Sequence, residues 1–212
     1  MNSNDGLIDY LKDEGSLESE ALERAFKQVD RANFTPNVDD SHREGEVFVD
    51  RERNPYTNEV YPVSDNSTIS QPSVVAQMLE LLEPESGDDV LEVGSGSGYQ
   101  AAVISGVASS VIGVEIEPEV ADYSRRKLEK YQDVEIRQGN GLEQVDSQFD
   151  KIIFSCAVDE ETFRDAKLYL KPEGRLVAPV GTGAVQEITV YDGNEEEEFR
   201  EGRVRFIRYK DE

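Results

Sequence analysis

Three glycines and a carboxylate around the end of an apolar run are the residues of this chain whose spacing most directly suggests chemistry. The stretch "VLEVGSGSGYQAAVIS", residues 90–105, carries Glu92 inside the run and Gly94, Gly96 and Gly98 after it. Glycine lets a backbone turn tightly and approach a ligand closely, although Gly-Ser repeats also form turns that bind nothing. The spacing G-x-G-x-G differs from the G-x-G-x-x-G of dinucleotide sites, where a helix N-terminus holds pyrophosphate. Because Glu92 would repel a phosphate, the pattern favours a positively charged nucleoside.

Two more polar residues follow later apolar runs. Glu115 comes directly after Val111–Val114, where a carboxylate can accept both ribose hydroxyls of a nucleoside, although the chain contains many acids. Asn140 in "QGNGL" can contact an adenine edge, although Asn-Gly is also an ordinary turn. Three loops at the carboxyl ends of neighbouring parallel strands form one crevice. We therefore predict a pocket for S-adenosylmethionine, which carries a sulfonium and an ammonium and no phosphate.

Strand-like and helix-like runs alternate through the middle of the chain, as in a parallel sheet covered on both faces. The expected strands are Val90–Val93, Val111–Val114, Val134–Ile136, Lys151–Cys156 and Arg175–Pro179. The expected helices between them are Gln100–Val107, Pro118–Tyr131 and Glu160–Leu170. "VQEITVYDG" and "RVRFIRY" predict an antiparallel hairpin at the sheet edge, with the acidic run Glu195–Glu198 as a solvated tip and no metal site.

The N-terminal third is expected to contain one helix and a long irregular arm. Apolar residues at helical spacing predict a helix over Ser16–Arg31 with Ser16 as its cap. Ala32–Asn66 is rich in Pro, Asn and Asp, and so long a loop is often a lid or a binding wall. The next helix begins at Pro72, with Ser70 or Gln71 near its cap.

The length of 212 residues fits one α/β domain. We divide residues 1–212 of this single domain into an N-terminal helix and arm (1–66), a cofactor-binding core (67–182) and a C-terminal hairpin (183–212).

The charge balance is strongly acidic, because 46 Asp and Glu against 22 Lys and Arg give a formal net charge of −24. Hydrophobic residues make up 37% of the chain and lie in periodic runs, which argues against a disordered chain. No basic cluster of the kind that binds nucleic acid is visible. A folded protein from a high-salt cytoplasm, that is, from a halophile, accounts for the excess, because the Debye length falls to about 3 Å at 1 M salt.

Several features favour a cytoplasmic protein. No window approaches the ~18 consecutive apolar residues of a membrane helix, and "MNSNDGLIDYLKDEG" lacks the regions of a signal peptide. Cys156 is the only cysteine, so no internal disulfide can form, as expected in a reducing compartment. We expect neither membrane nor nucleic-acid partners, and a monomer is favoured although no pattern fixes the oligomeric state.

The quoted motifs resemble those of a known family. "VLEVGSGSGYQAAVIS" followed by "GVEIEP" is similar to class I S-adenosylmethionine-dependent methyltransferases. "STISQPSVVAQMLELL" resembles the T-I-S-x-P segment of the protein-L-isoaspartate O-methyltransferases, and "LERAFKQVDRANFTP" is similar to that family's N-terminal helix and arm. The likeness runs from about residue 22 to residue 180. It implies a Rossmann-like methyltransferase fold with a mostly parallel, doubly wound sheet, an antiparallel C-terminal hairpin and an N-terminal helical arm.

The resemblance also implies an activity and a site. The activity is transfer of a methyl group from S-adenosylmethionine to the free carboxylate of L-isoaspartyl, and also D-aspartyl, residues in damaged proteins, which initiates repair. Ser70 and Thr68 would lie where the substrate carboxylate meets the methyl group. The implied cofactor-binding residues are Gly94, Ser95, Gly96 and Gly98 around the methionine portion, Glu115 at the ribose, Asn140 and Gly141 at the adenine, and Glu92, Tyr99 and Ile116 beside them.

The chemistry needs no general base, because carboxyl groups with a pKa near 4 are already ionised at neutral pH. Alignment of the two reactants can supply ~7–11 kcal/mol of the barrier. The single histidine, His42, lies in the irregular arm, and Cys156 is expected to be a buried or cleft-lining thiol rather than a nucleophile.

Some positions depart from the family pattern. Asp65 and Asn66 replace the usual glycines before T-I-S, Asn140 replaces an aspartate, and "GRVRFIRYKDE" replaces an apolar, proline-containing end. These differences leave two alternatives open. One is a methyltransferase of the same fold with another acceptor, RNA or a small molecule, and the other is a cofactor-binding paralogue without activity.

Overall fold

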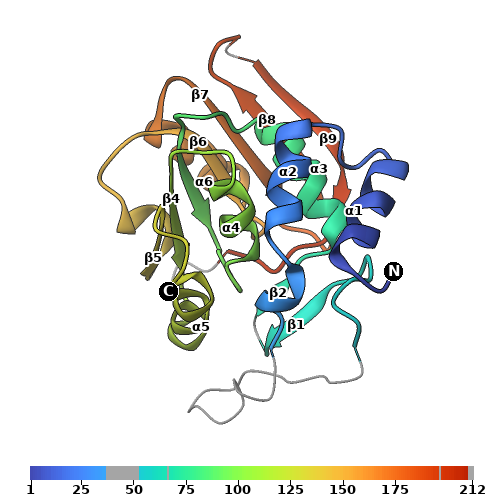
Figure 1. Cartoon of the computed structure of the whole chain (residues 1–212). Helices are drawn as coiled ribbons and strands as arrows, with labels where there is room; N and C mark the ends of the chain where they lie inside the picture. The colour runs from blue at the N-terminus through green and yellow to red at the C-terminus, as the bar shows by residue number, and fades with distance from the viewer. Residues whose placement is uncertain (37–52, 66, 196, 210–212) are drawn as a thin grey trace.

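The computed structural model describes residues 1–36, 53–65, 67–195 and 197–209. Its centre is a seven-stranded sheet with the strand order β5-β4-β3-β6-β7-β8-β9 (Figure 1). The strands are β3 (Asp89–Val93), β4 (Ser110–Glu115), β5 (Val134–Gln138), β6 (Phe149–Phe154), β7 (Leu170–Val180), β8 (Gln186–Asp192) and β9 (Glu197–Val204). The first five are parallel, and β8 and β9 form an antiparallel edge. The predicted α/β fold is confirmed. Because β4 and β6 flank β3, the winding of the chain reverses there, which is where such sheets bind ligands.

Consecutive residues of the parallel strands face opposite sides of the sheet and fill two separate cores. Val90 and Ile153 belong to one core, and their neighbours Leu91 and Ile152 belong to the other. The first face is covered by α3 (Pro72–Leu82), α4 (Tyr99–Ser105) and α5 (Pro118–Leu128), and the second by α6 (Glu160–Ala166). Burial on both faces explains why the strands are continuous apolar runs in the sequence.

The chain opens with a helix that the sequence analysis did not predict. α1 (Asn4–Asp13) begins after Ser3, whose hydroxyl accepts the Gly6 N–H. Three apolar side chains on one face of α1 are buried, those of Leu7, Ile8 and Leu11. A serine cap followed by an apolar stripe is a recognisable helix start, so the signal was present.

The residues between the first two helices end α1 rather than begin α2. Gly15 has a φ of 71°, and the Ser16 N–H donates to the Leu11 carbonyl at 2.9 Å. A glycine in the left-handed region with this back-bond is a common helix C-cap. The prediction that Ser16 caps the following helix is therefore wrong, and α2 (Glu20–Gln28) begins after Ser19.

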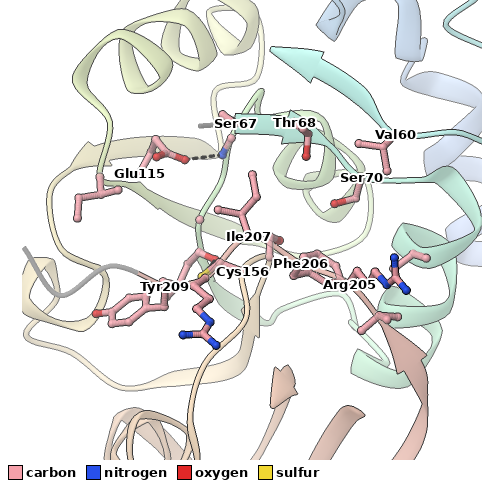
Figure 2. Close-up of a pocket in the computed structure, with 18 of the residues that line it drawn as sticks. Val60, Ser67, Thr68, Ser70, Glu115, Cys156, Arg205, Phe206, Ile207 and Tyr209 are labelled. Carbon is pink, nitrogen blue, oxygen red and sulfur yellow. Dashed lines mark hydrogen bonds between the residues drawn. The ribbon is translucent and has the colours of Figure 1, made fainter. Parts of the chain in front are cut away.

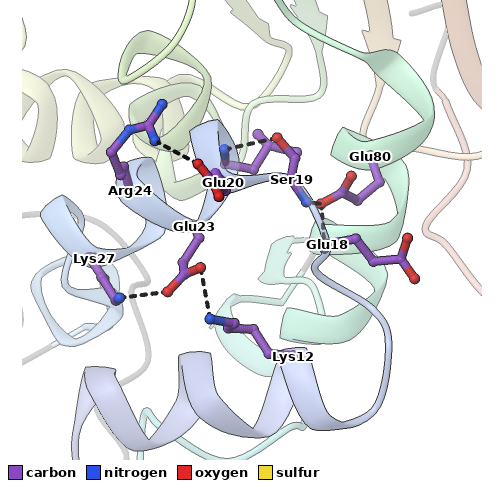
Figure 3. A network of polar contacts seen from close by, with 9 residues as sticks. Lys12, Glu18, Ser19, Glu20, Glu23, Arg24, Lys27 and Glu80 are labelled. Carbon is purple, nitrogen blue, oxygen red and sulfur yellow. Dashed lines mark hydrogen bonds and ion pairs between the residues drawn. The ribbon is translucent and has the colours of Figure 1, made fainter.

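Polar contacts fasten α1, α2 and α3 to one another (Figure 3). Glu23 of α2 lies 2.8 Å from Lys12 of α1 and 2.6 Å from Lys27, and these hydrogen bonds lower the pKa of Glu23 to about 2. Glu80 of α3 accepts two backbone N–H groups at 2.8 Å, from Ser19 and from the residue before it. The three helices contact one another, and α3 also contacts β7 and β8 (Figure 1).

A short hairpin lies in the region that was expected to be irregular. β1 (Tyr61–Ser64) pairs antiparallel with β2 (Ser67–Ile69). The side chains of Tyr61 and Ile69 are buried on one side of this hairpin. Thr68 and Ser70, on either side of Ile69 in the sequence, therefore project to the opposite side. Residues 31–34 also form a 3-10 helix. The expectation of irregular chain over all of 32–66 is thus wrong at both ends of that range, and its middle, including His42, lies outside the described residues.

The C-terminal hairpin differs from its predicted limits. β9 begins at Glu197, inside the stretch predicted to be the turn, and only the first two residues of "RVRFIRY" belong to it. The Phe206 N–H leaves the strand ladder and donates to Gln186 Oε1 at 2.9 Å. The Ile207 carbonyl accepts the Ala157 N–H at 2.7 Å. Arg205–Tyr209, which we call the C-terminal crossing segment, therefore crosses toward the carboxyl ends of the parallel strands. Within the described ranges, no helix has the length and apolarity needed to cross a membrane.

A buried arginine joins the N-terminal helices to the region before α3. Arg31 has an exposed fraction of 0%, and its guanidinium donates to four backbone carbonyls, those of Pro55, Thr57, Glu59 and Ser70. Burial lowers its pKa to about 10, so the group stays charged at neutral pH. Residues 55–59 form no helix or strand, and their backbone is held in place by hydrogen bonds from the Arg31 guanidinium.

Replacing Arg31 by Met should lower the free energy of unfolding by about 2 kcal/mol or more, because four carbonyls would lose a charged donor. Urea unfolding monitored by circular dichroism measures the change. Arg24→Met is the matched control, since the Arg24 side chain is 66% exposed, and it should cost no more than about 0.5 kcal/mol. Equal losses in the two variants would show that Arg31 has no special structural role.

Candidate functional site

A cavity of about 650 Å³ lies at the carboxyl ends of β3, β4 and β6 (Figure 2). One wall is the glycine loop after β3 together with the end of β4. The opposite wall is formed by β2, the residues that lead into α3, and the C-terminal crossing segment. The cavity therefore combines the predicted core loops with segments from both ends of the chain.

The glycine loop presents bare backbone to the cavity. Gly94 and Gly96 line it and have φ values of 83° and 53°, which side chains rarely adopt. A Cβ at Gly94 would lie 3.3 Å from the Cys156 side chain. The N–H groups of Gly94 and Ser95 both donate to the Val114 carbonyl, at 2.8 and 3.1 Å, so the end of β4 fixes the turn.

Glu115 lines the cavity at the end of β4 and is only 6% exposed. Its Oε2 accepts the Gly96 N–H at 2.9 Å (Figure 2). Its Oε1 accepts the Glu117 N–H at 3.0 Å. Burial raises the pKa of Glu115, and the two N–H bonds oppose that effect. Each carboxylate oxygen keeps further acceptor capacity, so the group can accept two neighbouring hydroxyls.

Glu92 lies behind the loop rather than in the cavity. It has an exposed fraction of 0%, and its Oε1 accepts the Ser155 hydroxyl at 2.8 Å. Ser155 lines the cavity and accepts from Gln100 Nε2 at 2.8 Å. Glu92 Oε2 is buried with no partner among the described residues. Burial raises the pKa of Glu92 to about 8, and the nearby Glu115 adds to the effect.

Ser70 and Thr68 lie on the wall opposite Glu115 (Figure 2). The Ser70 hydroxyl has no hydrogen-bond partner in the described part of the chain and points into the cavity. The N-cap position of α3 is occupied by Gln71, without a side-chain cap bond, so Ser70 is not the helix cap. Its carbonyl is bound by Arg31 Nη2 at 3.2 Å, which fixes the backbone that carries the hydroxyl.

The third predicted loop reaches the cavity through Gly141, and Ile116 from the β4 loop lines it as well. A Cβ at Gly141 would lie 2.9 Å from the Tyr209 ring. Asn140 is not among the lining residues, and its Oδ1 accepts a hydrogen bond from the Tyr209 hydroxyl. Asp65, one of the departures from the family pattern, lies in the turn after β1 and does not line the cavity.

Three more predicted site residues do not line the cavity. Ser95 is buried. Gly98 is the N-cap of α4 with a φ of 83°, and a Cβ there would lie 2.6 Å from Leu128 Cδ1. The Tyr99 ring packs edge-on against Phe34, with centroids 5.7 Å apart. These residues shape the loop and join α4 to its neighbours.

Sequence reasoning missed part of the cavity wall. Ser155 directly follows β6, and the same strand-end rule that singled out Glu115 could have found it. The C-terminal crossing segment carries no such signal, because hydrogen bonds to Gln186 and Ala157 bring it to the site. Cys156 lines the cavity, and burial raises the pKa of its thiol, which disfavours the nucleophilic thiolate.

The donor and acceptor set fits S-adenosylmethionine. A rigid carboxylate can accept the ribose hydroxyls, the glycine backbone leaves room that side chains would fill, and an unpartnered buried carboxylate oxygen of Glu92 lies behind the loop. The Glu115 carboxylate beside the loop favours a cationic ligand over a phosphate.

Comparison with known proteins agrees with this geometry. Residues 2–211 match the family model described as protein-L-isoaspartate(D-aspartate) O-methyltransferase. The protein-L-isoaspartate O-methyltransferase of Methanospirillum hungatei is 38% identical over 72% of this chain and 76% of its own. The enzyme of that name from Methanopyrus kandleri is 34% identical over 93% and 85%. A Plasmodium falciparum crystal structure described as a β-aspartate methyltransferase in complex with S-adenosyl-L-homocysteine has the same fold, with a TM-score of 0.80, 21% identity and full coverage of both chains.

The buried carboxyl of Glu92 should make stability fall as the pH rises. Its folded-state pKa of about 8 lies above the unfolded value of 4.5, so the folded protein binds more protons in that window. The free energy of unfolding should fall between about pH 5 and pH 8, by at most about 1.4 kcal/mol per pH unit from this group. Glu92→Gln should have a flatter profile in urea unfolding from pH 5 to pH 8.

The control is Glu119→Gln, which removes an exposed carboxylate from α5 and should keep the wild-type slope. Because the pKa of Glu115 is raised for the same reason, a shallower slope should remain in Glu92→Gln. If the Glu92→Gln profile matched the wild type, Glu92 would be ionised in the folded protein across this range.

Proposed function

The chain belongs to the protein-L-isoaspartate(D-aspartate) O-methyltransferase family, and we propose that its cavity brings the methyl group of S-adenosylmethionine to an isoaspartyl carboxylate held at Ser70. It is a methyltransferase that uses S-adenosylmethionine and acts on L-isoaspartyl residues of damaged proteins, which starts their repair. D-aspartyl residues are included in the proposal. The observation that carries it is the placement of Glu115 and Ser70 on facing walls of one cavity.

We propose that Glu115 binds the ribose and that the loop at Gly94 and Gly96 surrounds the methionine portion. Glu115 is held in position by two backbone N–H groups, so little further ordering is needed when hydroxyls bind. Ile116 and Gly141 would flank the adenine from the next two loops. Asn140 would support that side through Tyr209, to which it is hydrogen bonded.

Ser70 is proposed to donate a hydrogen bond to the substrate carboxylate and so to aim one of its oxygens at the methyl carbon, with Thr68 beside it. When bound, the cofactor supplies a methyl group on a sulfonium, whose S–C bond breaks as the new O–C bond forms. The carboxylate attacks in its ionised form, so no residue has to remove a proton. The residues of the site therefore act by alignment and exclusion of water, which agrees with the Cys156 thiol being held neutral by burial.

The activity is tested with methyl-labelled S-adenosylmethionine, an isoaspartyl peptide and its aspartyl twin. Base-labile label should enter only the isoaspartyl peptide, because methyl esters are hydrolysed by base and normal aspartate places its carboxylate differently. Cofactor binding without label in either peptide would contradict the activity. Transfer to RNA or to a small molecule instead would favour another acceptor.

Ser70→Ala and Glu115→Gln should separate the two walls of the site. Ser70→Ala should lower kcat about tenfold or more, with little change in the Kd for cofactor, because one hydrogen bond to a charged group is lost. Glu115→Gln should weaken cofactor binding about tenfold or more, because an amide oxygen can accept only some of the bonds that the carboxylate accepts.

Calorimetric titration with the cofactor and single-turnover assays measure the two effects. Ser109→Ala and Glu119→Gln are the matched controls, since both residues are exposed and neither lines the cavity. Wild-type kcat in Ser70→Ala would remove Ser70 from the mechanism, and unchanged cofactor Kd in Glu115→Gln would remove Glu115 from the cofactor site.

We also propose a cytoplasmic, salt-adapted, monomeric protein. With a net charge of −24, self-repulsion should destabilise the fold until salt screens it. The Tm should therefore rise by several degrees between about 0.1 M and about 2 M KCl. Sucrose of equal osmolality is the control, because it favours compact states without screening charge. A Tm that is flat or falls with KCl would contradict salt adaptation.

A further inference from the structure

The C-terminal crossing segment forms one edge of the cavity and is anchored on both sides. Phe206 is bound to Gln186 at one end. At the other end the Tyr209 N–H donates to the Ala157 carbonyl at 2.7 Å, and the Tyr209 hydroxyl donates to Asn140. Its backbone is therefore fixed relative to β8 and to the loops that follow β5 and β6, and the side chains between the anchors are presented at a defined place.

This edge is cationic, in contrast to the chain as a whole. Arg205 and Arg208 of the segment and Arg203 at the end of β9 line the cavity. The chain has 46 acidic and 22 basic residues, yet Arg205 and Arg208 are exposed and have no ion-pair partner within the described residues. By comparison, Arg200 of β9 contacts two carboxylates at 2.6 and 2.7 Å.

Acidic and basic side chains line different parts of the cavity. Its acidic lining residues, Glu115 and Glu117, belong to the β4 loop, where the cofactor is proposed to bind. Arg205 lies on the opposite side, near Ser70 and Val60 (Figure 2). Arg205 is therefore beside the proposed methyl acceptor and across the cavity from Glu115, and Arg208 lines the same cavity three residues further along the segment.

We propose that Arg205 and Arg208 select isoaspartyl sites that are flanked by carboxylates, so that the substrate class is acidic polypeptide. This inference rests on the proposed function. A protein with a net charge of −24 repels acidic chains over its surface generally. Two guanidiniums that have no ion-pair partner among the described residues offset this repulsion where the substrate enters. Guanidiniums bind carboxylates through paired hydrogen bonds, and exposed ion pairs of this kind change affinity about threefold each.

The test uses three isoaspartyl peptides of one length whose flanking residues are Glu, Gln or Lys. KM and kcat are measured at the lowest KCl concentration at which the enzyme stays folded. For the wild type, the KM of the Glu-flanked peptide should be about tenfold below that of the Gln-flanked peptide. In the Arg205→Gln, Arg208→Gln double variant this ratio should fall to about one, and in the wild type it should shrink as KCl is raised.

Arg164→Gln is the matched control for the change of charge. Arg164 is exposed on α6 and does not line the cavity, so its variant should keep the wild-type ratio of KM values. A general loss of stability would change kcat for all three peptides alike, and it would leave that ratio unchanged.

The outcomes distinguish failure of this inference from failure of the proposed methyltransferase activity. If the wild type methylates all three peptides with equal KM, or prefers the Lys-flanked one, the selection for acidic polypeptide is wrong while the methyltransferase activity stands. A preference for Glu flanks that survives in the double variant would overturn the role of the two arginines. If no isoaspartyl peptide is methylated, the proposed function fails and this inference fails with it.

Discussion

The cavity depends on the hydrogen bonds that the end of β4 makes to the glycine loop. The Val114 carbonyl accepts the N–H groups of Gly94 and Ser95, and the Glu115 carboxylate accepts that of Gly96. A loop with positive φ values has no regular partner for its N–H groups, and buried N–H groups need acceptors. The residue expected to bind ribose is thus also the residue that holds the loop open for it. Structural and ligand-binding roles share one carboxylate, and the third loop is joined to the same place by the Gly139 N–H, which donates to the Glu115 carbonyl at 2.9 Å.

The opposite wall of the cavity is stabilised by core packing and by one buried arginine. β1 and β2 form a two-stranded hairpin, a unit that is marginal alone. Part of its stability comes from the core into which Tyr61 and Ile69 are packed. The rest comes from Arg31, whose guanidinium donates to backbone carbonyls before the hairpin, in residues 55–59, and after it, at Ser70. The N-terminal helices are therefore part of the site, because they place this arginine under the residue proposed to meet the substrate.

The sequence was sufficient where local pattern decides the structure. The strands, the helices between them and the strand-end residue Glu115 follow from periodicity and from the rule that parallel strands meet at one edge. It was insufficient where a tertiary contact decides. The sequence predicts Ser16 as a helix start because the bond of its N–H back to Leu11 is not visible in composition. It also predicts that the last strand continues to Tyr209, whereas the strand ends at Val204 and Gln186 accepts the Phe206 N–H. Tyr99 directly follows the glycine loop and is predicted to bind the cofactor, but its ring packs against Phe34 in the core. The individual roles of the site residues remain predictions.

The acidic composition and the cationic edge act over different distances. Screening by salt weakens interactions beyond a Debye length of about 3 Å at 1 M, which is shorter than the spacing of most surface acids and comparable with the length of a hydrogen-bonded ion pair. High salt should therefore remove most of the long-range repulsion between this chain and another acidic chain, while it weakens direct contacts with Arg205 and Arg208 only in part. Attraction at the cavity then no longer has to overcome the field of the whole protein. At high salt, Arg205 near Ser70 and Arg208 on the same cavity edge, both without an ion-pair partner among the described residues, can therefore discriminate among substrates although the molecule as a whole carries a charge of −24.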